Sequence, residues 1–252
     1  MISTRGTAVI TGGGRGIGRA IAHRLHKDGF DILVVDRDGE TAQAVADEVD
    51  GRSAALDVTD AVAMGSLTDL APECTALVSN AALTLYTPLL ETPADQARLV
   101  FDVNVIGQLI GAQALAPVIT ANGGGSIVNL SSITARSHPP ATGMYSPSKA
   151  AVEQLTRALA LELGPTGVRV NAIAPGSVPT EGSDEHYGEN DALSRRAAVL
   201  PLRRLGIVED ISSAVSWFCS EEASYVTGQI LAVDGGFMVS NGHFFRLARG
   251  DG

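Results

Sequence analysis

The chain has few cysteines and no long apolar run. Its two cysteines, Cys74 and Cys219, are far apart and form no CxxC pair, so we expect two buried thiols in a reducing compartment. The opening stretch MISTRGTAVITGG is too short and too polar before its first apolar run to be a signal peptide. No stretch of about 18 apolar residues is present to span a bilayer. These absences predict a soluble, cytoplasmic protein without a membrane partner.

The chain is also poor in basic charge. Lysine and arginine together number 18 against 28 aspartates and glutamates, which gives a formal net charge of −10. This balance argues against nucleic acid or an anionic membrane as the main partner. Hydrophobic residues make up 45% of the 252 residues. A disordered chain is therefore excluded, and the length is sufficient to bury a sizeable core.

Short apolar runs alternate with longer helical patterns along the whole sequence. The runs predict seven buried strands, at 7–11, 31–36, 52–58, 75–81, 126–132, 168–175 and 229–236. Helical patterns fall between them, at about 16–28, 39–49, 60–70, 94–121, 144–164 and 207–220. Runs that are apolar throughout are typical of parallel strands covered on both faces. We therefore expect an α/β fold with a doubly wound, seven-stranded parallel sheet in three layers, forming one domain over 1–252.

Two segments depart from this alternation. Residues 177–206 insert a long irregular stretch between the sixth strand and the last long helix. Such a stretch in a compact domain is usually a functional lid or a disordered loop, and we interpret this one as a substrate lid. Residues 237–252 follow the last strand as a C-terminal tail. Its phenylalanines would be costly to expose, so we expect the tail to dock on the protein.

A glycine-rich turn connects the first strand to the first helix. In TAVITGGGRGIGRAIAHRL the glycines Gly12, Gly16 and Gly18 follow a G-x-x-x-G-x-G spacing. Glycine lets the backbone approach a pyrophosphate closely, and the N-terminus of the helix offers free N–H groups and the positive end of its dipole. The position between a strand and a helix strengthens the prediction of a dinucleotide site.

Asp36 ends the second strand, 18 residues after Gly18. A carboxylate there can accept hydrogen bonds from a ribose 2′-hydroxyl and would repel a 2′-phosphate, which favours NAD over NADP. Arg15 in the glycine turn and Arg37 beside the aspartate could instead contact a phosphate. NAD is therefore the expected cofactor, and NADP stays possible.

Lysine is rare in this chain: there are 16 arginines but only Lys27 and Lys149. The segment GMYSPSKAAVEQ places Lys149 four residues after Tyr145, and Pro147 is tolerated between them if the helix begins near the tyrosine. The two side chains then share one helix face. At ~4 Å and an effective dielectric of ~20, an ammonium would favour the phenolate by ~4 kcal/mol, or about 3 pK units. This lowering would suit a tyrosine acting as an acid–base group near neutral pH.

These motifs together resemble the short-chain dehydrogenase/reductases, over residues of about 7 to 236. TGGGRGIG is similar to the family's TGxxxGxG cofactor turn, and YSPSK is similar to its YxxxK motif. The resemblance implies a Rossmann fold and hydride transfer between a nicotinamide and a carbonyl carbon. It also implies four catalytic residues. Ser132 would stabilise the substrate oxygen and Tyr145 would exchange a proton with it. Lys149 would lower the tyrosine pKa and hold the nicotinamide ribose, and Asn104 would position a water molecule.

The resemblance adds further expected cofactor contacts. Besides Gly12, Arg15, Gly16, Gly18, Asp36, Arg37, Tyr145 and Lys149, these are Ile17, Asp57, Val58, Asn80, Ala81, Ala82, Pro175, Gly176, Val178 and Thr180. One position departs from the family's pattern: Ala82 stands where the family's NNAG motif has glycine. The extra methyl group affects the expected local fit of the cofactor and not the expected activity.

The family's substrates are diverse, so three functions remain open at this point. The first is an NAD-linked dehydrogenase of a neutral secondary alcohol, polyol or sugar. The second is a 3-oxoacyl thioester reductase of the acyl-carrier-protein type that uses NADPH. The third is a cofactor-sensing scaffold without catalysis, which loss of Tyr145 or Lys149 would indicate; both residues are present. The expected partner is a small-molecule substrate. The chain is expected to form a homotetramer, as is common in the family. No metal site is expected.

Overall fold

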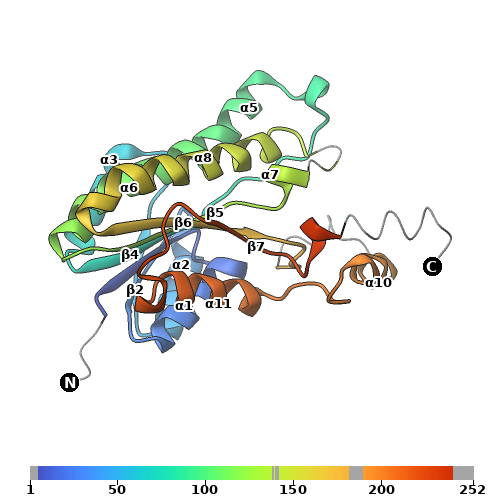
Figure 1. Cartoon of the computed structure of the whole chain (residues 1–252). Coiled ribbons are helices and arrows are strands. Elements are labelled where there is room, and N and C mark those ends of the chain that lie inside the picture. Colours follow the sequence, from blue (N-terminus) through green and yellow to red (C-terminus); the bar gives the residue numbers. More distant parts are fainter. Residues whose placement is uncertain (1–4, 138, 140–141, 182–189, 241–252) are drawn as a thin grey trace.

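The computed structural model describes residues 5–137, 139, 142–181 and 190–240. Its centre is a seven-stranded parallel sheet with the strand order β3-β2-β1-β4-β5-β6-β7 (Figure 1). The strands are β1 (Thr7–Thr11), β2 (Asp31–Asp36), β3 (Arg52–Ala55), β4 (Cys74–Ser79), β5 (Gly125–Leu130), β6 (Val168–Pro175) and β7 (Ile230–Val233). The predicted doubly wound sheet is confirmed.

Helices cover both faces of this sheet. They are α1 (Gly16–Lys27), α2 (Gly39–Glu48), α3 (Ala61–Gly65), α4 (Leu67–Leu70), α5 (Ala94–Phe101), the π-helix η2 (Asp102–Ile106), α6 (Gly107–Ala121), α7 (Thr134–Ser137), α8 (Tyr145–Leu163), α10 (Asn190–Val199) and α11 (Val208–Phe218). Single 3₁₀ turns are η1 (Leu89–Glu91), η3 (Gly164–Thr166), η4 (Glu221–Ala223) and η5 (Phe237–Val239).

The alternation of side chains along each strand divides the core into two apolar layers. Ile10 of β1 faces α1, α2 and α11, which contribute residues such as Leu25, Val45 and Phe218. The neighbouring Val9 faces the other layer, where α4, α6 and α8 pack. Figure 1 shows α6 and α8 on one side of the sheet and α1 and α11 on the other. Burial on both faces explains why the strands read as continuous apolar runs.

Several predicted strands are shorter in the structure because polar groups end them. The predicted strand 52–58 ends at Ala55, and Asp57 accepts hydrogen bonds from the N–H and hydroxyl of Thr59, at 2.8 and 2.7 Å, in a turn. The predicted strand 75–81 ends at Ser79, after which the N–H of Asn80 bonds to a threonine hydroxyl on β1. These early ends leave irregular backbone at the carboxyl edge of the sheet.

The predicted helix 94–121 is present but is interrupted by the π-helix η2. By length and mean hydropathy, 1.5 in its most apolar part, this helical run could cross a bilayer. Its buried residues, among them Leu115 and Ile119, pack against the sheet, which accounts for its apolar character without a membrane.

The described residues of the segment predicted as an irregular lid, 177–206, include the helix α10. Within this segment, residues 182–189 lie outside the described residues, as do residues 241–252 of the predicted tail. The described start of the tail is the turn η5.

Candidate active site

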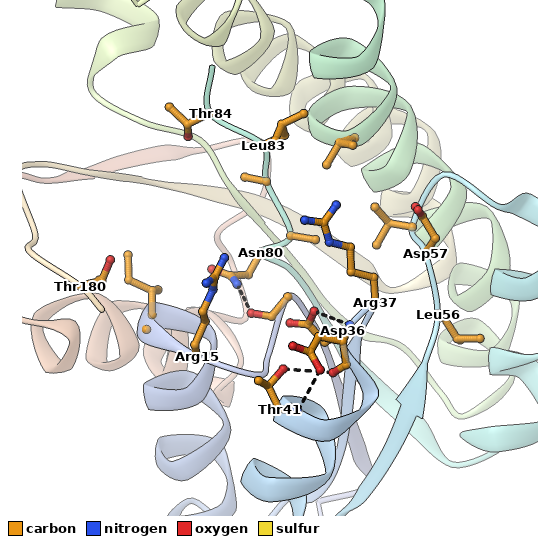
Figure 2. Close-up of a pocket in the computed structure, with 18 of the residues that line it drawn as sticks. Arg15, Asp36, Arg37, Thr41, Leu56, Asp57, Asn80, Leu83, Thr84 and Thr180 are labelled. Atoms are coloured by element: carbon orange, nitrogen blue, oxygen red, sulfur yellow. Dashed lines mark hydrogen bonds between the residues drawn. The ribbon is translucent and has the colours of Figure 1, made fainter. Parts of the chain in front are cut away.

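A cavity of about 500 Å³ lies at the carboxyl ends of β1, β2 and β4. In the strand order, β1 and β4 are neighbours and the chain changes direction between them, which is where doubly wound folds bind ligands. Figure 2 shows side chains from several elements converging on this space. The predicted cofactor residues that line it are Gly12, Arg15, Gly16, Ile17, Asp36, Arg37, Asp57, Val58, Asn80, Ala81, Ala82 and Thr180.

The glycine turn forms the floor of the cavity, and Gly12 and Gly18 cannot accept side chains. Gly12 has φ +62°, and a Cβ atom built there would lie 2.7 Å from the Cα of Ala81. A Cβ on Gly18 would lie 2.1 Å from the carbonyl oxygen of Gly12. Gly18 therefore acts by close packing of helix against turn and does not line the cavity. The Nδ2 of Asn80 donates to the same Gly12 oxygen at 2.7 Å, which fixes the turn against β4.

The N-terminus of α1 opens directly at this floor. Arg15 occupies the N-cap position in extended conformation, and its side chain makes no capping hydrogen bond. The first N–H groups of a helix have no partner within the helix, so they can bind an anion, aided by the positive end of the dipole. Together with the glycines, this arrangement fits a pyrophosphate.

Asp36 is fixed at the end of β2 by two backbone N–H groups. Its Oδ2 accepts from Gly14 at 3.1 Å, and its Oδ1 accepts from Asp38 at 3.2 Å. Each carboxylate oxygen keeps a further lone pair. The carboxylate lines the cavity, as Figure 2 shows, so it can accept hydrogen bonds from a neutral polar ligand such as a ribose hydroxyl.

Two arginines extend into the same cavity, from opposite sides of Asp36 (Figure 2). Hydrogen bonds from the N–H and the hydroxyl of Thr59 lower the pKa of Asp57, and the charge of Arg37 lowers it further. Arg37 therefore lies in the field of a second carboxylate. Arg15 stands at the glycine turn, where a phosphate would bind.

Besides Gly18, five predicted cofactor residues do not line this cavity: Tyr145 and Lys149, described below, and Pro175, Gly176 and Val178. Pro175 is the last residue of β6, and Val178 is buried against α11 in the core. Gly176 lines a separate cavity of about 130 Å³, and a Cβ there would lie 2.6 Å from the Cα of Asp234. Their contact with a cofactor stays a prediction.

Tyr145 and Lys149 stand on the first turns of α8. The helix begins at Tyr145, so Pro147 falls in the first turn, where its missing N–H has no helical partner to lose. The Nζ of Lys149 lies 5.6 Å from the centre of the Tyr145 ring and donates to the carbonyl of Leu130 at 2.7 Å. The predicted pair is thus on one helix face, beside the end of β5.

Lys149 is almost completely buried, with 1% of its surface exposed. This burial lowers its pKa from the ordinary 10.5 to about 7, because the charged form loses its hydration. An ammonium has three donors, and Leu130 takes one of them. The sequence predicted the proximity to the tyrosine and did not predict this loss of basicity.

Ser132 follows β5 and is also buried. Its Oγ accepts from the N–H of Thr134 at 3.2 Å and from the hydroxyl of Thr134 at 3.0 Å. Because both lone pairs of the oxygen are then occupied, the Ser132 hydroxyl is left to donate its proton. A donor of this kind suits a substrate oxygen that gains negative charge.

Asn104 connects the cavity to α8. It lies in η2 with no exposed surface; π-turns of this kind are frequent at functional sites. Its Oδ1 accepts from the N–H of Leu83 at 2.7 Å, and its Nδ2 donates to the Leu83 carbonyl at 3.0 Å and to the Ser148 hydroxyl at 2.9 Å. The side chain thus holds the cavity wall at Leu83 against the helix of Tyr145 and Lys149.

Sequence reasoning missed part of the site. The further residues that line the cavity are Asp38, Thr41, Leu56, Leu83, Thr84, Val103 and Glu181. Asp38 could have been found, since it precedes a helical pattern and accepts from two N–H groups of α2 as a cap. Tyr86, whose ring centre lies 6.5 Å from that of Tyr145 in an edge-on arrangement, carries no sequence signal.

The residues present therefore fit a nicotinamide dinucleotide. A Cβ on Gly12 or Gly18 would collide with the turn that would hold the pyrophosphate. The N-terminus of α1 suits the phosphates, and Asp36 suits a ribose. Among the described residues, no group of three or more His, Cys, Asp or Glu side chains is arranged to hold a metal ion.

The chain is similar to known proteins over most of its length. The family model described as enoyl-(acyl carrier protein) reductase matches residues 12–238. Galactitol 2-dehydrogenase (L-tagatose-forming) from Cereibacter sphaeroides is 39% identical over 243 residues, covering 92% of this chain and 94% of that protein. L-2,3-butanediol dehydrogenase from Corynebacterium glutamicum is 36% identical over 254 residues, covering 92% and 98%.

The chain is also similar to a solved structure. The complex of 7α-hydroxysteroid dehydrogenase with NADH and 7-oxo glycochenodeoxycholic acid matches with a TM-score of 0.87 at 32% identity, covering 92% of this chain and 94% of that chain. The chain therefore belongs to the short-chain dehydrogenase/reductase family. Within it, the protein is an NAD(P)-dependent alcohol dehydrogenase or ketoreductase. The predicted family, fold and enzyme class are confirmed.

Proposed function

We propose that the enzyme interconverts a neutral secondary alcohol, a polyol or a sugar with the corresponding ketone and prefers NAD. The observation that carries the proposal is the Lys149 amine, buried between the carbonyl of Leu130 and the ring of Tyr145. Among the described residues no carboxylate pairs with this lysine. Burying a lysine in this way is costly, which supports a functional role.

The bound cofactor supplies the hydride acceptor or donor. Tyr145 exchanges a proton with the substrate oxygen. When the amine of Lys149 is charged, it stabilises the phenolate form of Tyr145. Ser132 donates its hydroxyl proton to the same substrate oxygen, because Thr134 already occupies the serine lone pairs. Asn104 keeps the cavity wall aligned with this group, and the water-positioning role expected for it remains part of the proposal.

The NAD preference rests on Asp36. Its carboxylate lines the cavity, is oriented by two N–H groups, and would repel a 2′-phosphate. Arg15 and Arg37 line the same cavity and could offset this repulsion, although Arg37 lies in the field of Asp57. NADP therefore stays the second cofactor of the proposal.

The substrate class is supported by the relatives. Galactitol and 2,3-butanediol, named for two of them, are neutral polyols. The ring of Tyr86, whose centre lies 6.5 Å from that of Tyr145, adds an aromatic group beside the catalytic tyrosine. The negative face of an aromatic ring suits the C–H groups of a polyol or sugar.

One observation favours a second candidate, an acyl thioester reductase that uses NADPH: the description of the matching family model names an acyl carrier protein substrate. The loop 122–124 before β5 carries no lysine or arginine that would attract an acidic carrier. The scaffold alternative needs an incomplete site, and both Tyr145 and Lys149 are in place.

The proposal includes a homotetramer in the cytoplasm, with one domain per chain. The outer face of α8 exposes Leu161 with 82% of its surface, while Val152 on the inner face is fully buried. A second copy would cover this outer face. The segment 177–206, which carries α10, is assigned to the substrate lid. The docking of the tail remains a proposal, since residues 241–252 lie outside the described part of the chain.

A direct test is a panel of alcohols and ketones with NAD(H) and NADP(H), read as absorbance at 340 nm. We expect turnover of a polyol or other secondary alcohol with a higher kcat/KM for NAD. Tyr145→Phe should lower kcat by about 10²-fold or more and keep NAD binding. The exposed Tyr225 provides the control, since Tyr225→Phe should keep full activity. Turnover only with NADPH and acyl thioesters would replace the proposal by the second candidate.

A further inference from the structure

Glu153 is a buried carboxylate that none of the roles above uses. It follows Tyr145 and Lys149 on α8 at intervals of four residues, so the three side chains share one face of the helix. Only 5% of its surface is exposed. A carboxylate in such a position is rarely kept unless it is paired and hydrogen-bonded.

The partners of Glu153 come from two places. One oxygen, Oε2, accepts from the Nε of Arg136 at 3.1 Å and lies 3.8 Å from Nη2 of Arg157. The Ser131 hydroxyl has one proton, which it shares between the carbonyl of Lys149 at 3.1 Å and the other oxygen of Glu153, Oε1, at 3.5 Å. Arg157 belongs to α8 itself, whereas Arg136 and Ser131 belong to the segment after β5.

That segment carries Ser132. Ser131 directly precedes Ser132. Arg136 lies in α7, which begins two residues after Ser132. The hydroxyl of Ser132 is oriented by Thr134 in the same short stretch. Glu153 therefore fixes the chain on both sides of Ser132 to the helix that carries Tyr145.

We infer that Glu153 is a positioning residue, which sets the distance between the Ser132 hydroxyl and the Tyr145 phenol by holding segment 131–137 on α8. A substrate oxygen must meet both groups at once, and a displacement of about 1 Å in such a site can lower the rate by about 10²-fold. The ion pair acts through alignment, since a buried pair is by itself weak evidence for stability. The inference rests on the proposed roles of Ser132 and Tyr145.

The chain offers a matched pair of variants. Arg136→Gln breaks the contact between segment 131–137 and Glu153, whereas Arg157→Gln removes a partner of the same carboxylate without touching that segment. We expect Arg136→Gln and Glu153→Gln to lower kcat at least tenfold, with the KM for NAD within twofold of the wild-type value. Arg157→Gln should keep kcat within twofold. Equal effects of the two arginine variants would overturn the inference.

A double-variant cycle separates positioning from a general loss of stability. Ser132→Ala removes the group that Glu153 positions, so adding Glu153→Gln in that background should change kcat by less than twofold. If the two losses multiply, Glu153 acts by another route and the inference is wrong. Should Glu153→Gln fail to fold, Arg136→Gln replaces it in the cycle, since Arg136 is half-exposed.

Hydrogen exchange supplies a readout that does not depend on turnover. In Arg136→Gln the amides of segment 131–137 should exchange faster than in the wild type, while those in Arg157→Gln should not. Unchanged exchange in Arg136→Gln would refute the positioning role whatever the activity. Retained turnover in Ser132→Ala or Tyr145→Phe would instead refute the proposed function.

Discussion

In the cofactor-free protein, replacing Lys149 by methionine should raise the free energy of unfolding. The gain should be larger at low pH than at high pH. Methionine has a similar length and no charge, so it fits the buried site without a desolvation penalty. The catalytic function of the site would be lost. The stability change isolates the free energy of holding the lysine in the core.

The magnitude follows from the pKa. In the unfolded chain the lysine has a pKa of 10.5, and burial lowers it to about 7 in the folded protein. Between these values the unfolded chain binds more protons, so stability rises with pH from about 7 to about 10.5. At about 1.4 kcal/mol per pK unit, the cost of Lys149 is about 5 kcal/mol at pH 6 and about 2 kcal/mol at pH 9.

Urea denaturation followed by circular dichroism at pH 6 and pH 9 measures this effect, at one fixed protein concentration. The gain in unfolding free energy from Lys149→Met should be about 3 kcal/mol larger at pH 6 than at pH 9. Lys27→Met is the matched control, because Lys27 is exposed at the end of α1; its effect should not change with pH. A Lys149→Met gain that is the same at both pH values would refute the burial argument.

Three further predictions concern cofactor choice, the cavity wall and assembly. Asp36→Ala should reduce the ratio of kcat/KM for NAD to kcat/KM for NADP by at least about tenfold. Glu40→Ala, at an exposed position, should leave this ratio unchanged. A wild-type enzyme that already prefers NADP would contradict the NAD proposal. Asn104→Ala removes the three hydrogen bonds of a buried side chain, so urea denaturation should show a loss of about 2–3 kcal/mol in unfolding free energy. An unchanged value would contradict the role of Asn104 in holding the cavity wall at Leu83. Light scattering at micromolar concentration should report a tetramer. Leu161→Arg should weaken this assembly, whereas Val62→Arg on α3 should not. A monomeric wild-type protein would rule the assembly out.

The local pattern of the sequence predicted the elements and their order. Continuous apolar runs predicted strands buried on both faces, and the glycine spacing at Gly12, Gly16 and Gly18 predicted the turn that the structure has. The start of α8 at Tyr145 was predicted from Pro147, because proline is tolerated in a first turn. These features depend on neighbours in the chain, so periodicity and turn chemistry suffice to find them.

Element ends and interruptions were predicted less well, because distant groups decide them. β4 ends where two N–H groups turn to the Thr11 hydroxyl on β1. The π-helix within 94–121 turns Asn104 toward Leu83, which is 21 positions away in the sequence. Neither partner is visible in a local pattern.

The sequence by itself determined which chemistry is present: a strand–glycine turn–helix unit, an aspartate at the end of the second strand, and a tyrosine four residues before a rare lysine. Only the tertiary structure decided the environment of those groups. Folding buries Lys149 and lowers its pKa, and it brings Glu153 into contact with both sides of Ser132. The physical reason is that solvation and hydrogen-bond partners depend on packing between segments that are distant in the chain, whereas helix and strand patterns depend on adjacent residues.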